Sequence, residues 1–172
     1  MRAKFYVYQP WLTLVARLIL GGVLLAAGGL KIGNLQKSAM AVRAYEMLPV
    51  GLANFLGYAL PWIEIGIGLL LIVGAAVAIC GLLGAFTMFA FIIAIAQAWA
   101  RGLSIDCGCF GGGGKIDPED TKYLSEIIRD IGLLALGIYL TTFQKVNLDW
   151  INREKKWQLH LVEIKELAIW LS

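Results

Sequence analysis

The chain has 172 residues, of which 59% are hydrophobic and 16% are charged, and its mean hydropathy is +0.74. Soluble domains are about 45–50% apolar and about 25% charged, so this chain in water would leave large apolar patches exposed. A net charge of +3 spread along the chain excludes the dense basic patch of a nucleic-acid-binding domain, and three cysteines exclude a disulfide-rich secreted scaffold. The composition therefore predicts a protein whose solvent is the lipid bilayer.

The first apolar run covers residues 11–30, the length that a helix needs to cross a hydrocarbon core. Arg2 and Lys4 before it are also typical of a signal peptide, with Ala26-Ala27 as a cleavage site. The run is longer than a usual signal core, however, and it contains Arg17. We therefore expect a retained transmembrane helix.

Residues 31–50 mix charged, polar and apolar side chains and end near Pro49, which predicts a loop with a short interfacial helix. The next fifty or so residues are almost continuously apolar, about twice the length of one span. A hairpin turn at Gly74 divides this stretch into spans over residues 52–73 and 76–98.

Two features of this apolar stretch bear on its packing. Pro61 lies inside the first of the two spans, and because proline has no N–H we expect a kink there and a free carbonyl at Gly57. Trp62 and Trp99 are interpreted as packing residues or interface anchors rather than as a quinone pocket.

The long polar segment between spans covers residues 101–121 and contains Cys107-Gly108-Cys109 and a run of four glycines. Asp117-Pro118 then predicts a helix start, with Asp117 as the N-cap, Pro118 as the first helical residue and acidic residues in the first turn. The fourth span follows over residues 123–143.

The tail after the fourth span is amphipathic, with apolar residues at helical spacing opposite charged ones. It predicts a helix that lies in the membrane interface or, alternatively, a docking helix for a partner. The expected fold is therefore all-α: an integral membrane four-helix bundle over residues 1–146 and a C-terminal amphipathic helix over residues 147–172.

Four spans place both termini on one side of the membrane and the two long loops, residues 31–50 and 101–121, on the other. Seven basic residues lie in the terminal segments and five in the two loops. This small excess favours cytoplasmic termini and a cysteine loop on the extracytoplasmic side.

Cys107 and Cys109 are the residues whose chemistry we expect to matter. A disulfide between them would close a very small ring at the strained edge of S–S geometry, which makes such a pair oxidising and easily exchanged. Gly108 between them widens the accessible backbone angles. A structural staple would not be built across one residue, because it would close almost no loop entropy.

The neighbouring charges act in both directions. Arg101 and Arg129 would favour a thiolate, and Asp106 would oppose it. Two alternatives stay open: idle thiols, or a two-coordinate soft-metal site at Cys107 and Cys109 for Cu(I) or mercury. A four-coordinate zinc site needs two more ligands, and the single histidine lies in the tail, on the opposite side.

The third cysteine is interpreted differently. Cys80 lies near the start of its span, too far along the helix to pair with the other two, and is expected to be a small core residue.

Four charged residues fall within the predicted spans: Arg17, Glu64, Arg129 and Asp130. Charges at such depth are expensive and normally face the bundle interior in pairs. One interpretation is a set of ion pairs that fixes helix register, for example Glu64 with Arg17 or with Arg129. The other is a polar floor beneath the cysteine loop that handles protons as the thiols are oxidised.

Taken in order, these residues resemble the MauE branch of the DoxX-like membrane proteins. The similarity covers roughly residues 10–143, and the string Cys107-Gly108-Cys109-Phe110-Gly111 is its most specific part. The other matching features are Arg17, Gly21-Gly22, Gly29-Leu30-Lys31, Tyr45, Leu48-Pro49, Pro61 with Glu64, and Arg129-Asp130.

The resemblance implies a four-helix bundle of the bacterial inner membrane that acts in thiol redox chemistry. Methylamine-utilisation members are needed to mature the disulfide-rich small subunit of methylamine dehydrogenase, together with a thioredoxin-like partner. DoxX-type relatives are linked to quinone-coupled sulfur oxidation, so a quinone is a candidate cofactor.

Three functions compete at this point. The first is an oxidoreductase in which Cys107 and Cys109 exchange with a thioredoxin-like or DsbA-like partner. It resembles in outline the DsbB and vitamin K epoxide reductase proteins, although those use two cysteine pairs and this chain has one. The second is a non-catalytic membrane anchor or assembly subunit, and the third is a soft-metal carrier.

Overall fold

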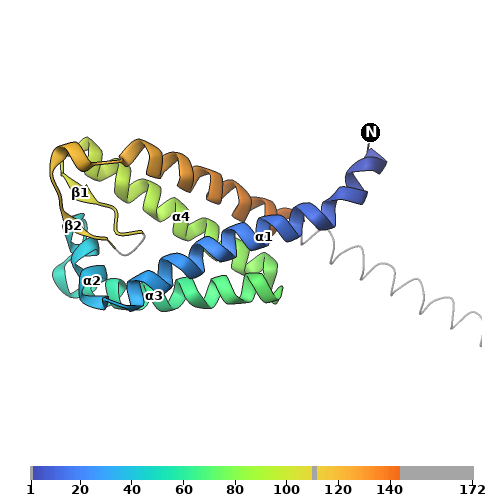
Figure 1. Ribbon diagram of the computed structural model, residues 1–172, viewed down its shortest axis with the longest axis horizontal. Coiled ribbons are helices and arrows are strands. Elements are labelled where there is room, and N and C mark those ends of the chain that lie inside the picture. The colour runs from blue at the N-terminus through green and yellow to red at the C-terminus, as the bar shows by residue number, and fades with distance from the viewer. Residues whose placement is uncertain (1, 110–111, 144–172) are drawn as a thin grey trace, which may run out of the picture.

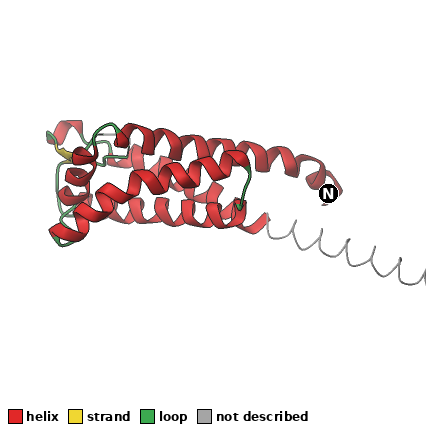
Figure 2. Cartoon of the chain, turned by 90° about the horizontal axis from the view of Figure 1, so that it is seen from below, coloured by secondary structure: helices red, strands yellow, loops and turns green. Residues whose placement is uncertain are grey.

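The computed structural model describes residues 2–109 and 112–143 of the chain, and its long helices lie side by side (Figures 1 and 2). In chain order these are α1 (Arg2–Ile32), α3 (Val50–Val73), α4 (Val77–Ala100) and a helix over residues 123–143. The predicted predominance of helix is confirmed. The amphipathic tail predicted over residues 147–172 lies outside the described residues.

Three of the described helices are long and apolar enough to cross a membrane: Gln9–Ile32 within α1, and the whole of α3 and α4. Their outward faces expose large apolar side chains such as Phe55, Trp62 and Phe86. Such faces fit a lipid environment rather than water. The helix over residues 123–143 is less apolar, because its first turns carry Glu126, Arg129 and Asp130.

The turn predicted at Gly74 is confirmed. Gly74 ends α3 with a left-handed φ of 88°, its N–H donates to Leu70 O, and α4 begins at Val77. Glycine suits this position because an L side chain rarely adopts such a positive φ.

The small elements of the fold, α2 and two short strands, lie at the end of the helices away from the Gly74 turn (Figure 1). The short helix predicted within residues 31–50 is present as α2 (Leu35–Ala44). The Asn34 side chain caps its start by accepting the Lys37 N–H at 3.1 Å. Two strands of two residues, β1 (Ile105–Asp106) and β2 (Gly114–Lys115), pair antiparallel and close the cysteine loop beside α2. These strands were not predicted.

The helix start predicted at Asp117 is wrong in part. Pro118–Asp120 form only one turn of 3-10 helix, η1, the Asp117 side chain makes no capping bond, and the chain is extended at Thr121. The long helix begins anew at Tyr123.

The Gly57 carbonyl, which Pro61 leaves without a backbone donor, accepts a hydrogen bond from another helix. The buried Ser38 hydroxyl of α2 donates to Gly57 O at 2.7 Å, and this bond holds α2 against α3. A Cβ at Gly57 would lie 2.4 Å from Ala39 Cα, so only glycine permits this approach.

Glycine also sets the spacing between the long helices. A Cβ on Gly28 of α1 would lie 2.7 Å from Pro61 O of α3, and one on Gly81 of α4 would lie 3.1 Å from Gly137 O of the 123–143 helix. Close approach at small residues is a usual way for helices to pack in lipid. The resulting core includes Leu20, Leu24, Leu71, Cys80 and Leu140.

Candidate redox site

The cysteine loop is tied to the helices on both sides by two tyrosines. The Tyr45 hydroxyl, just after α2, donates to Cys107 O at 3.0 Å. The Tyr123 hydroxyl donates to Leu103 O and accepts the Ile105 N–H at 2.9 Å. Both phenols are buried in one cluster with Ile95, Ala98, Ile105 and the two cysteines. The loop is therefore a packed part of the protein.

Within the loop, Asp106 and Gly108 shape the turn around the cysteines. The Gly108 N–H donates to Asp106 Oδ1 at 3.0 Å, and Gly108 has a left-handed φ of 69°. A Cβ at this position would lie 2.5 Å from the Ala41 Cβ of α2. Gly108 thus meets two requirements, a positive φ and close contact with a helix.

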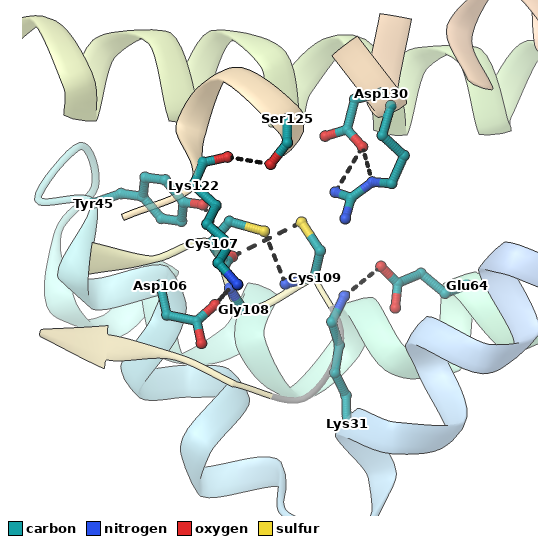
Figure 3. A network of polar contacts seen from close by, with 11 residues as sticks. Lys31, Tyr45, Glu64, Asp106, Cys107, Gly108, Cys109, Lys122, Ser125 and Asp130 are labelled. Atoms are coloured by element: carbon teal, nitrogen blue, oxygen red, sulfur yellow. Dashed lines mark hydrogen bonds and ion pairs between the residues drawn. The ribbon is translucent and has the colours of Figure 1, made fainter. Parts of the chain in front are cut away.

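Both cysteines are free thiols, with exposed fractions of 6% for Cys107 and 5% for Cys109. The Cys109 N–H donates to Cys107 Sγ at 3.2 Å, and the Cys109 thiol points toward Cys107 O at 4.0 Å (Figure 3). The third free thiol, Cys80, is buried in the separate core cluster described above, as the sequence predicted.

Cys107 lies beside two carboxylates. The Cys107 sulfur and a carboxylate oxygen from each of Asp106 and Glu126 all lie within 4.8 Å of one another. Glu126 Oε2 is buried and has no hydrogen-bond partner among the described residues. A thiol next to an unpartnered carboxylate oxygen has a proton acceptor at hand. The same three groups would also suit a metal ion as ligands.

Cys109 faces the interior of the bundle, where a buried ion pair and a partly buried one lie close by (Figure 3). Lys31 Nζ lies 2.6 Å from Glu64 Oε1, and Arg129 lies 2.8 Å from Asp130 Oδ1. A cavity of about 10 Å³, room for roughly one water, is lined by Cys109, Glu64 and Asp130 together with apolar side chains of α1 and α4. The second oxygens, Glu64 Oε2 and Asp130 Oδ2, have no partner in the described part of the chain.

The surroundings of the site raise the pKa of the Cys109 thiol and of the Tyr45 phenol. The hydrogen bond of Cys109 with the Cys107 thiol, then burial and the charges of Cys107 and Asp130, raise the pKa of Cys109 well above its ordinary value, and Lys31 opposes part of this. Burial, followed by the nearby thiols, raises the pKa of the Tyr45 phenol. Tyr45 therefore stays protonated and remains a donor to the loop.

The structure brings together most of the residues that the sequence singled out. Cys107, Cys109, Asp106, Glu64, Arg129 and Asp130 all lie in this one region. Arg17 does not: it donates to Leu71 O at 2.9 Å and to Ile72 O at 3.1 Å, at the opposite end of α3. The suggested pairing of Glu64 with Arg17 is wrong, and Lys31 is the partner instead.

The structure changes the expected roles of three other charged residues. Arg101, which was expected to favour a thiolate, contacts Tyr45 O and Glu46 instead. Lys31 and Glu126 were not among the predicted site residues. The spacing of Glu126 three and four residues before Arg129 and Asp130, on one helix face, was the available signal for Glu126.

With this geometry in place, comparison with known proteins decides the family. A family described as methylamine utilisation protein MauE matches residues 9–143. The chain belongs to the MauE family. No solved structure matches it.

Two curated relatives carry the MauE name. The chain is 40% identical over 108 residues to the methylamine utilization protein MauE of Methylorubrum extorquens, which is 62% of this chain and 58% of that protein. It is 32% identical over 138 residues to the MauE of Methylophilus methylotrophus, covering 78% of this chain and 70% of that protein. The match to the first relative thus spans less than two thirds of that MauE protein.

Proposed function

We propose that this MauE family member is a membrane thiol–disulfide redox protein in which Cys107 and Cys109 alternate between a dithiol and an internal disulfide. The observation that carries the proposal is that both sulfurs lie beside carboxylates: Cys107 beside half-buried Glu126, and Cys109 beside the cavity that buried Glu64 and Asp130 line. Forming a disulfide from two thiols releases two protons, and these carboxylates are positioned to accept them.

The exchange balances as follows. A thiolate of the dithiol attacks a sulfur of a partner disulfide, the partner's S–S bond breaks, and a mixed disulfide forms. The second cysteine then attacks the mixed disulfide, which leaves the internal disulfide on this chain and a dithiol on the partner. Two electrons have moved to the partner, whose thiols take up two protons. In reverse, the internal disulfide oxidises a partner dithiol.

The setting of this reaction is part of the proposal. The helix over residues 123–143 would be the fourth span of a four-helix bundle in the bacterial inner membrane, with the cysteine end on the extracytoplasmic side. The partner would be a thioredoxin-like or DsbA-like protein. Because both relatives are named for methylamine utilisation, the process supported would be the maturation of a disulfide-containing extracytoplasmic protein of that pathway.

The test traps free thiols in membranes with a mass-shifting maleimide before and after mild reduction. A membrane-impermeant maleimide, applied to intact cells in parallel, reports the side. We expect Cys107 and Cys109 to be blocked until reduction in cells and then to label from outside. A Cys80→Ser variant is the matched control, because it removes the buried core thiol and should leave this pattern unchanged.

The outcomes separate the competing functions. If both thiols label freely without reductant even after exposure to an oxidant, the redox proposal fails. A Cys107→Ser, Cys109→Ser double variant that still supports growth on methylamine would favour an assembly role. Stoichiometric Cu(I) or Hg(II) bound by the reduced protein, with no disulfide formed, would favour a metal carrier.

A further inference from the structure

The two thiols of the site are not equivalent in their hydrogen bonds. Cys107 Sγ is an acceptor, because the Cys109 N–H points at it from 3.2 Å. Cys109 Sγ is a donor, aimed at Cys107 O from 4.0 Å. A sulfur that accepts a backbone N–H is stabilised as a thiolate, whereas a sulfur that donates to a carbonyl is stabilised as a thiol.

The charges around the two sulfurs follow the same division. The groups near Cys109 come from α1, α3 and the 123–143 helix, and their charges cancel: Lys31 and Arg129 are cationic, and Glu64 and Asp130 are anionic. Because Glu64 and Asp130 each already pair with a cation, moving the Cys109 proton onto either carboxylate would weaken an existing ion pair. Cys107 faces Asp106 of its own loop, Tyr45 and the unpartnered carboxylate oxygen of Glu126. Transfer of a proton from Cys107 to Glu126 leaves the net charge unchanged.

We propose that Cys107 is the sulfur that exchanges with the partner, with Glu126 as its proton acceptor, and that Cys109 is the resolving thiol. The inference rests on the function proposed above and assigns roles within that site. Cys107 gives its proton to Glu126 and attacks the partner disulfide. Cys109 then attacks Cys107 Sγ, its proton passes to Asp130 or Glu64 across the water-sized cavity, and the bond between Cys107 and the partner breaks. In the opposite direction, the partner thiolate attacks Cys107 Sγ, and Cys109 leaves and takes up a proton. The partner's second thiol then gives up its proton and attacks the partner sulfur of the mixed disulfide, and Cys107 leaves and takes up a proton.

The test uses the full-length protein in detergent, reduced, in a Cys80→Ser background, with oxidised glutathione as the disulfide probe. Intact-protein mass spectrometry follows the glutathione adduct over time in Cys109→Ser and in Cys107→Ser variants. We expect the Cys109→Ser variant to form its adduct, on Cys107, on the order of tenfold faster, because exchange rates follow the thiolate fraction. Both sulfurs are almost equally buried, so static exposure does not account for such a difference.

A third variant tests the role of Glu126. In the Cys109→Ser background, Glu126→Gln should slow adduct formation at neutral pH, and the rate should recover at alkaline pH, where hydroxide removes the proton. If Glu126 were only a nearby negative charge, its removal would make the thiolate easier to form and the reaction faster. Faster exchange would therefore overturn this assignment.

Two measurements distinguish a wrong assignment of the cysteine roles from a wrong function: whether the internal disulfide forms, and which cysteine forms the glutathione adduct faster. If the parent protein with both cysteines forms no internal disulfide with oxidised glutathione, the redox function itself fails. If that disulfide forms but the Cys107→Ser variant traps glutathione at an equal or higher rate, the roles of the two cysteines are wrong and the function stands. The same rates are measured in Cys107→Ala and Cys109→Ala variants. Only variants that elute from size exclusion like the parent protein are compared, so that a misfolded serine variant is recognised.

Discussion

Lys31 Nζ and Glu64 Oε1 lie 2.6 Å apart with side chains only 3% and 1% exposed, and they join the end of α1 to the middle of α3. The ammonium also lies 5.2 Å from the centroid of the Phe91 ring of α4. Removing one partner of a buried pair leaves the other charge uncompensated, which costs about 3–5 kcal/mol. Lys31→Met should therefore lower the thermal unfolding midpoint in detergent strongly, and adding Glu64→Leu should restore much of the loss.

The control for this prediction is the exposed ion pair of Arg101 with Glu46, whose side chains are 44% and 48% exposed. Exposed pairs contribute about 0–1 kcal/mol, so Glu46→Gln should leave the midpoint almost unchanged. Equal effects of Lys31→Met and Glu46→Gln would mean that the Lys31–Glu64 pair is not stabilising the fold.

The backbone at Gly108 offers a second prediction. Gly108→Ala would place a Cβ 2.5 Å from the Ala41 Cβ at a φ of 69°, whereas Gly102→Ala has a similar φ of 67° and open space. Both substitutions carry left-handed strain of about 1–2 kcal/mol, and only the first adds a steric clash of about 1–3 kcal/mol. The unfolding midpoint should fall further in Gly108→Ala, and Ala41→Gly should recover the difference. No recovery would show that strain, and not the clash with α2, makes Gly108 necessary.

Three apolar helices could be predicted because lipid imposes a simple rule on the sequence: long apolar runs are helices, and Gly74 interrupts one. The free carbonyl at Gly57 could be predicted for an equally local reason, since Pro61 has no N–H. The donor to that carbonyl, Ser38, could not, because a hydrogen bond between two helices depends on how they pack.

The site was predicted only in part, because the partner of Glu64 also depends on how the helices pack. A lysine at the end of an apolar run is typical of an interface anchor, and the predicted span stopped at residue 30. In the structure α1 continues to Ile32, which carries Lys31 into the bundle beside Glu64. Strands of two residues have no hydrophobic period to detect, so the pairing of β1 with β2 left no sequence signal.

The raised pKa of Cys109 should make the stability of the folded protein fall at alkaline pH. The pKa of Cys109 is raised, so the folded protein keeps this proton at a pH where the unfolded chain, with a thiol pKa of about 8.5, has lost it. Stability contributed by Cys109 is then present below about pH 8.5 and is lost as the pH rises toward the folded-state pKa. We expect the unfolding midpoint to fall over that alkaline range, and less so in Cys109→Ser.

Alkylation reports the same shift directly. With iodoacetamide on the reduced protein and the site read by tandem mass spectrometry, Cys109 should remain unmodified at neutral pH. As the pH rises, the alkylation rate of Cys109 should still increase at a pH where the alkylation rate of the thiols in the denatured chain has reached its plateau. Alkylation of Cys109 at the rate of the denatured chain at neutral pH would contradict this prediction.

Two neighbouring glycines of α1, Gly28 and Gly29, face in different directions. Gly28 is buried, and a Cβ there would lie 2.7 Å from Pro61 O and from Ile65 Cγ1, whereas a Cβ on exposed Gly29 would meet nothing within 4 Å. Replacement by alanine raises helix propensity by about 1 kcal/mol at either position. Only Gly28→Ala must push α1 and α3 apart, at a cost of about 1–3 kcal/mol and next to the Lys31–Glu64 pair.

The two variants should therefore shift the unfolding midpoint in opposite directions, Gly29→Ala upward and Gly28→Ala downward. Thermal unfolding followed by tryptophan fluorescence in detergent gives both values under one condition. Because the two sites share one helix and the same substitution, a difference in sign isolates the contact between α1 and α3. If Gly28→Ala proved as stable as Gly29→Ala, the helices would not be as close at Pro61 as the structure places them, and the position of Glu64 one turn later would be in question too.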